Sequence, residues 1–161
     1  MSDMSVLSFI GRMDEAFRDG DPLVDSKSTE AQNVAHVRRQ FEAISRGDFA
    51  AFAESLADDV ELVIHAGPDI PFRGRCRGRR AVADQVRWNF GIVLEQLPEI
   101  HGLCAQGDMV VVFGSERGRF RSDNREYQLA FVQVHTVRDG QTVRFRQYVS
   151  DVADGEKDVT G

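Results

Sequence analysis

Residues 126–152 read EYQLAFVQVHTVRDGQTVRFRQYVSDV, and this stretch decides the fold class. Two runs rich in Val, Phe and Tyr flank Arg138-Asp139-Gly140, a turn sequence that tolerates the left-handed backbone of a tight hairpin. Two more runs precede them, over 100–106 and 109–120, and Gly107-Asp108 joins these two. Because side chains alternate with a period of two in all four runs, the sequence predicts a long antiparallel meander.

The chain before the meander has the period of helices instead. Apolar residues recur at helical spacing over about 29–46, 49–57 and 79–95, and a strand is predicted over 60–65. Three helices followed by a meander indicate an α+β fold. We expect a cone-shaped barrel, in which a curved antiparallel sheet wraps around the three N-terminal helices and leaves one small-molecule pocket at the open end.

The 161 residues are divided by composition into three parts. Residues 1–29 are predicted to form a helical arm and a linker, 30–152 the pocket domain, and 153–161 a polar tail. The arm carries apolar residues at helical spacing between Val6 and Phe17. That apolar stripe needs a partner, which is either the domain itself or a second subunit.

Composition argues against several classes of function. A net charge of -6 disfavours nucleic-acid binding, and the arginines over 73–80 and 117–125 are typical of a solvated strand face. Cys76 and Cys104 form no CxxC motif, so we predict no disulfide framework, no metal site, no cofactor and a reducing cytoplasmic location. No apolar run has the length of a membrane span, and the first ten residues lack the pattern of a secretory signal.

Three groups of short motifs carry a resemblance to a known family. They are RGDF at 46–49 with LADDV at 56–60, FRG at 72–74 with RGRRAV at 77–82, and TVRDG at 136–140 with RFRQY at 144–148. In this order and spacing they resemble the nuclear transport factor 2-like superfamily, and within it the SnoaL-like and ketosteroid isomerase-like proteins, over about 30–152. The superfamily hosts isomerases, cyclases, dehydratases, hydrolases and non-catalytic modules, so the resemblance implies a fold and leaves the activity open.

The resemblance also implies where an isomerase would keep its groups. The carboxylate base position falls on Ile64, the tyrosine donor position on Gln40, and the acidic donor position on Gln133. An amide donates a hydrogen bond to a carbonyl oxygen but does not carry protons near neutral pH. Ordinary ketosteroid isomerase activity is therefore not expected, whereas binding of a carbonyl or hydroxyl group is.

Strand alternation selects the residues that face the pocket. Phe145, Gln147 and Val149 share one face of the last strand, and Phe131 and Gln133 share one face of the strand before it. Gln147 stands where many SnoaL-like relatives have a glutamate, so the pocket is predicted to be neutral. Alternatively, the two glutamines bond to each other across the strands and are structural.

Other candidates have two interpretations each. Glu116 either points inward as the acid or base, or points outward as a cross-strand partner of an arginine. Phe41, Phe52 and Trp88 either pack in the core or line the pocket. His65 is either a base displaced by one residue from the expected position or a structural or surface histidine, because a one-residue step on a strand points the opposite way. His135 is expected to be half exposed near a strand end.

Three functions remain open on these residues. The first is a cofactor-free acid–base enzyme, an isomerase, cyclase or hydrolase acting on a small, apolar, oxygenated molecule. The second is a non-catalytic module that binds such a ligand, and the third is a dimerisation domain whose pocket is filled by its own side chains. A homodimer is predicted through the outer sheet face, which carries Val132 and Val134.

Overall fold

The computed structural model describes residues 29–72 and 74–151. The predicted arm before Thr29 and the predicted tail over 153–161 lie outside the described residues. The helices are α2 (Thr29–Ser45), α3 (Phe49–Glu54) and α4 (Arg79–Gly91). The strands are β1 (Leu56–Ala66), β2 (Gly74–Arg77), β3 (Val93–Gln106), β4 (Met109–Phe120), β5 (Glu126–Arg138) and β6 (Gln141–Asp151).

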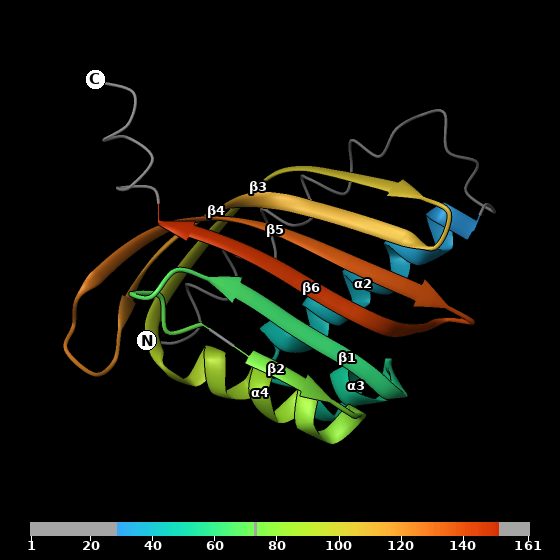
Figure 1. The fold of residues 1–161 in the computed structure, drawn as a ribbon, viewed down its shortest axis with the longest axis horizontal. Helices are drawn as coiled ribbons and strands as arrows, with labels where there is room; N and C mark the ends of the chain where they lie inside the picture. Colours follow the sequence, from blue (N-terminus) through green and yellow to red (C-terminus); the bar gives the residue numbers. More distant parts are fainter. Residues whose placement is uncertain (1–28, 73, 152–161) are drawn as a thin grey trace.

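The strands form one curved sheet, and the helices lie against its concave face (Figure 1). The sheet order is β2-β1-β6-β5-β4-β3, and every neighbouring pair is antiparallel except β1 and β6, which are parallel. The predicted α+β architecture is confirmed. The predicted barrel is wrong, because β2 and β3 at the two ends of the order do not pair with each other and the sheet stays open.

The first strand of the meander is longer than predicted, and the helix before it is shorter. The pattern predicted a helix over 79–95, but α4 ends at Gly91 and β3 begins at Val93. Arg121, in the turn after β4, donates from Nε to the Gly91 carbonyl at 3.1 Å and from its backbone N–H to the Ile92 carbonyl at 2.8 Å. These bonds satisfy the carbonyl groups at the end of α4, where the chain changes from helix to strand. Pro98 lies within β3, which an edge strand tolerates because one of its sides needs no N–H donors.

The chain leaves α3 early for a similar reason. Asp48 accepts a hydrogen bond from the Ala51 N–H at 3.0 Å and so caps the start of α3, as its position predicted. The Ser55 carbonyl accepts the Thr142 N–H at 3.0 Å, which ties the end of α3 to the start of β6. The chain therefore becomes a strand at Leu56 rather than continuing as a helix to residue 57.

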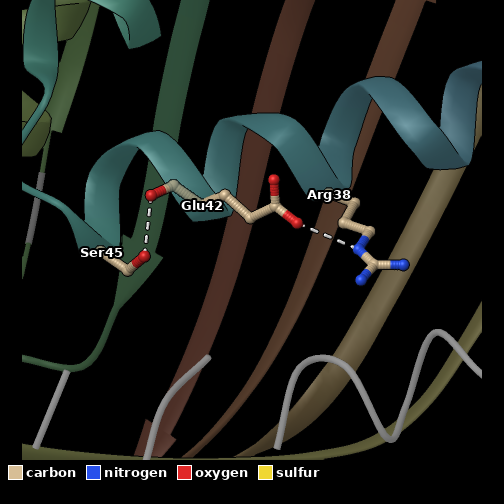
Figure 2. A network of polar contacts seen from close by, with 3 residues as sticks. All are labelled: Arg38, Glu42 and Ser45. Carbon is tan, nitrogen blue, oxygen red and sulfur yellow. Dashed lines mark hydrogen bonds and ion pairs between the residues drawn. The ribbon is translucent and has the colours of Figure 1, made fainter. Parts of the chain in front are cut away.

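The helix α2 presents polar residues on both of its faces. On a half-exposed face, the Arg38 Nε donates to Glu42 Oε1 at 3.1 Å and the Ser45 hydroxyl donates to the Glu42 carbonyl at 2.8 Å (Figure 2). The Arg38–Glu42 contact is an i,i+4 pair, and pairs of this kind stabilise a helix by about a few tenths of a kcal/mol. The buried face is unusual, because it brings the polar side chains of His36 and Gln40 into the interior. No helix in the described ranges has the length and apolar character needed to cross a membrane.

Candidate functional site

The helices and the concave face of the sheet enclose an elongated cavity. Its volume is about 110 Å³. Its wall is mainly aromatic and aliphatic, with a few polar groups set into it. Ten of the residues singled out from the sequence lie in this wall: Gln40, Phe41, Phe52, Ile64, Glu116, Phe131, Gln133, His135, Phe145 and Gln147.

Three other candidates lie away from the cavity wall. The His65 ring is exposed on the outer sheet face and stacks on the Tyr148 ring, with centroids 4.9 Å apart. His65 follows Ile64, which faces inward, so its side chain points to the other face. Trp88 is 52% exposed on α4, and Val149 is buried but forms no part of the cavity wall.

Glu116 is the carboxyl group of the cavity wall. Its residue is only 9% exposed, and its side chain points inward from the middle of β4. Gln96 Nε2 donates to Glu116 Oε1 at 2.7 Å, and the Tyr127 hydroxyl donates to Glu116 Oε2 at 2.8 Å. Burial raises the pKa of Glu116 above its ordinary value, and this outweighs the two hydrogen bonds, which lower it. The carboxyl group is therefore fixed in orientation and holds its proton more tightly than an exposed glutamate.

Two glycines on the same face of β4 make room for this carboxyl group. Gly114 and Gly118 flank Glu116 at two-residue spacing, so all three point inward. A Cβ at Gly114 would collide with the Glu99 carbonyl, and one at Gly118 with the Tyr127 ring. The missing side chains let β3 approach closely and let the Tyr127 ring lie across the strand. The motif Gly-x-Glu-x-Gly was visible in the sequence, but its meaning depends on which strands lie beside it.

A second polar cluster joins α2 to the start of β6. The Gln40 amide nitrogen donates to the hydroxyls of Ser55 and Thr142, both at 2.8 Å, and His36 Nε2 lies 3.0 Å from the Thr142 hydroxyl. Both amide hydrogens of Gln40 are thereby used within the protein. Burial is the main cause that lowers the pKa of His36 to about 4, so the ring is neutral at neutral pH.

His135 is buried, not half exposed as predicted. Its residue is 4% exposed, since Phe41 from α2 and Phe145 from β6 pack against the ring. His135 Nε2 lies 3.2 Å from Gln133 Oε1, and its buried Nδ1 has no hydrogen-bond partner among the described residues. Burial, with a smaller contribution from His36, lowers the pKa of His135 to about 3. Position near a strand end suggested exposure, but packing of α2 over this end of the sheet decided the outcome.

Gln133 and Gln147 lie side by side in the cavity wall. They are cross-strand partners in the register of β5 and β6. The predicted alternative, a bond between their side chains, is not what the structure contains, because Gln133 Oε1 is paired with His135. Within the described part of the chain, the Gln147 amide makes no side-chain hydrogen bond. Gln147 therefore presents both an acceptor and donors toward the cavity.

The isomerase base position carries no acid in the folded protein either. Ile64 lies in the cavity wall and is 8% exposed, so this part of the wall is apolar. The polar wall residues that sequence reasoning passed over are Asn89 on α4, Thr142 on β6 and Gln96, which lies in a segment assigned to the loop after a predicted helix. Tyr127 was also missed, because a tyrosine on a strand is ordinary until its hydroxyl is seen on a buried carboxylate. No group of three or more His, Cys, Asp or Glu side chains suited to a metal ion occurs among residues 29–72 and 74–151.

Known proteins resemble this chain in sequence and in fold. The family model of the SnoaL-like domain matches residues 37–145. An NTF2-like protein from Burkholderia xenovorans LB400 is 30% identical, over 80% of this chain and 96% of that one, with a TM-score of 0.67. No curated protein matches the chain.

Two structures of lower identity show the same fold. TerC, co-crystallised with polyporic acid, is 22% identical over 78% of this chain and 96% of its own, with a TM-score of 0.63. An LEH-like epoxide hydrolase of M. tuberculosis is 24% identical over 81% of this chain and 90% of its own, with a TM-score of 0.60. The family match covers more than half of the chain, and the fold agrees with it. The chain therefore belongs to the SnoaL-like family of the nuclear transport factor 2-like superfamily.

Proposed function

We propose that this protein binds a small, uncharged, largely apolar molecule that carries oxygen, and that it acts on this molecule by acid–base catalysis without a cofactor. The reaction would be an isomerisation, a cyclisation or a hydrolysis. The observation that carries the proposal is Glu116, a buried carboxyl group in the wall of an apolar cavity. Perturbed carboxyl groups in such cavities are the usual acids and bases of enzymes.

The chemistry assigned to each residue follows from its contacts. Glu116, whose pKa is raised by burial, gives a proton to a ligand oxygen or takes one from the adjacent carbon or from water. Gln96 and Tyr127 keep the carboxyl group in one orientation through their hydrogen bonds. Gln133 and Gln147 hydrogen-bond a ligand oxygen from the neighbouring wall, and the aromatic side chains hold its apolar part. An apolar wall favours an uncharged substrate, because burying an unpaired charge is costly.

The proposal is tested with small cyclic ketones, epoxides and lactones. Hydrogen exchange beside the carbonyl in D2O, and ring opening of the epoxides and lactones, are both followed by NMR. We expect turnover of at least one class, and we expect Glu116→Gln to lower its rate by about 100-fold or more. Glu126→Gln is the matched control, since Glu126 on β5 has an 84% exposed side chain and lies outside the cavity. If Glu116→Gln keeps the full rate, Glu116 is not the acid or base.

A non-catalytic binding module is the second candidate. It is favoured by Ile64 at the isomerase base position and by Glu116 as the single carboxyl group in the described cavity wall. In this case the wild type and Glu116→Gln would both bind apolar oxygenated compounds, and neither would convert them. Binding measured by calorimetry together with turnover measured by NMR separates the two functions.

We also propose a homodimer formed through the outer face of the sheet. An apolar row crosses four adjacent strands there, because Phe113 pairs with Val132, Val132 with Tyr148, and Tyr148 with His65. Phe113, Val132 and Tyr148 are 38–43% exposed in the single chain.

Cys76 and Cys104 are both free, which supports the reducing, cytoplasmic location inferred from the sequence.

A further inference from the structure

Two pairs of polar groups in the cavity wall lie at separate levels along the strands. Glu116 on β4 stands opposite Leu129 on β5, and Gln96 reaches it from β3. Gln133 stands opposite Val112 on β4 and beside Gln147 on β6. We call the first the acid level, formed by Glu116 and Gln96, and the second the amide level, formed by Gln133 and Gln147.

The two levels are far enough apart for one molecule to lie between them. Val112 and Glu116 are four residues apart on β4, which corresponds to about 13 Å along a strand. The wall between the levels is apolar, with Phe131 on β5 and Ile100 on β3 among its residues. The volume of about 110 Å³ is roughly seven to eleven times the minimum of about 10–15 Å³ that a cavity needs to hold one water molecule. This is room for a molecule of two linked rings rather than for a single small group.

Each level keeps hydrogen-bonding capacity that the protein does not use. Glu116 accepts one bond at each oxygen, and a carboxylate oxygen has two lone pairs. Gln133 uses its carbonyl oxygen on His135, which leaves the N–H groups of its amide. Gln147 has its whole amide available within the described residues. Polar groups in an apolar wall are costly unless they are paired, so a ligand that pairs both levels is favoured over one that pairs a single level.

We propose that the ligand is an uncharged, elongated molecule with a hydroxyl or carbonyl group at each end, one bound at the acid level and the other at the amide level. The two oxygen atoms would lie roughly 10 Å apart, less than the span of about 13 Å, because the ligand lies between the polar groups that bind it. This inference rests on the proposed function, because it concerns the ligand of the same cavity. It adds that recognition is two-ended, which a single acid–base group does not require.

Three rigid probes of one shape test this inference: biphenyl, para-phenylphenol and para,para′-biphenol. Their binding to the wild type is measured by calorimetry at neutral pH. We expect para,para′-biphenol to bind about two- to tenfold more tightly than para-phenylphenol, which is the strength of one added hydrogen bond. Gln147→Leu should abolish this difference, and it breaks no hydrogen bond within the described protein. Gln133→Leu should act in the same direction.

The matched control is Gln128→Leu, the same change at an exposed position of β5 outside the cavity. It should keep the full preference for the two-ended probe. Equal binding of the one-ended and two-ended phenols by the wild type would overturn the two-ended ligand and leave the proposed function standing. A preference that survives in the double variant of Gln133 and Gln147 would also overturn it. If none of the three probes binds, both the inference and the proposed ligand class fail.

Discussion

At the scale of single residues, the protonation of buried groups dominates the behaviour of this protein. Glu116 has a raised pKa and the two buried histidines have lowered pKa values, and in each case burial is the largest cause. Each group therefore prefers its neutral form. An interior built in this way suits an uncharged ligand, and it makes the stability of the fold depend on pH.

The wild type is predicted to lose stability as pH rises, because of Glu116. The Glu116→Gln variant is predicted to lack this loss. The folded-state pKa of Glu116 lies above its ordinary value of 4.5, so the folded protein holds this proton longer than the unfolded chain. The free energy of unfolding then falls as pH rises above about 4.5, by up to about 1.4 kcal/mol per pH unit until the folded-state pKa is passed. Urea unfolding across this range should show the smaller slope in Glu116→Gln, whereas the exposed control Glu126→Gln should match the wild type. Identical slopes in all three proteins would contradict a Glu116 carboxyl group whose pKa is raised by burial.

The buried histidines predict the opposite trend in acid. The pKa of His36 is lowered to about 4 and that of His135 to about 3, so the unfolded chain takes up protons first, near pH 6.5. Stability is therefore lost as pH falls from about 6.5 toward these values. In His135→Leu, the slope of unfolding free energy against pH between about 4 and 6.5 should be smaller by up to about 1.4 kcal/mol per pH unit. His101→Gln, at an exposed histidine of β3, should leave the slope unchanged; an equal effect of both substitutions would rule out His135 as the cause.

At the scale of elements, β4 is the strand that builds the acid side of the cavity. Its inward residues are bulky near the turn at Asp108, whereas the inward residues on either side of Glu116 are glycines. The glycines bring β3 close to β4, and Gln96 on β3 thereby reaches the carboxyl group. The helix α2 has the complementary role, because its buried polar face closes the other end of the cavity.

Gly114→Ala is predicted to destabilise the protein by about 1–3 kcal/mol, the usual cost of forcing an extra methyl group into a packed site. The added Cβ would collide with the Glu99 carbonyl, which belongs to the backbone of β3 and has no rotamer to change. Gly91→Ala is the control, since nothing lies within 4 Å of the Cβ position there. Thermal and urea unfolding should show a loss only in Gly114→Ala. A Gly114→Ala protein as stable as the control would mean that β3 does not approach β4 as described.

At the scale of the whole molecule, the open sheet has one face that the helices cover and one face that no described helix covers. The concave face is covered by α2, α3 and α4 (Figure 1). The outer face carries the apolar row from Phe113 to Tyr148. Exposed apolar patches of this kind mark interaction surfaces in proteins. A second copy placed on this face would leave both cavities free.

Val132→Glu is predicted to separate the dimer into monomers, because it places two unpaired charges at the centre of the proposed contact. Val132 is 38% exposed in the single chain, so the change should leave the fold intact. Sedimentation equilibrium at micromolar concentration should give the dimer mass for the wild type and the monomer mass for the variant. Glu126→Lys, a charge change at the far end of the same strand, is the control and should remain dimeric. A wild-type monomer at this concentration would refute the homodimer.

The sequence by itself determined the architecture, because periodicity is a local property. A period of two over 126–152 and the turn at Arg138-Asp139-Gly140 indicated the last hairpin, and Asp139 and Gly140 adopt the positive φ that this turn requires. Alternation also placed Phe145 and Gln147 on one face, and both line the cavity. The family followed from short motifs whose order along the chain needs no three-dimensional information.

Only the tertiary structure decided what surrounds each polar group. The direction of Glu116 depended on the register of β4 with its neighbours, and its partners Gln96 and Tyr127 come from two other strands. The burial of His135 depended on where α2 packs, not on its position in β5. Open edges at β2 and β3 likewise result from the order of all six strands. Pairing between distant segments decides which groups are buried, and burial shifts the pKa values of the groups in the cavity. These properties therefore cannot be predicted from a local stretch of the sequence.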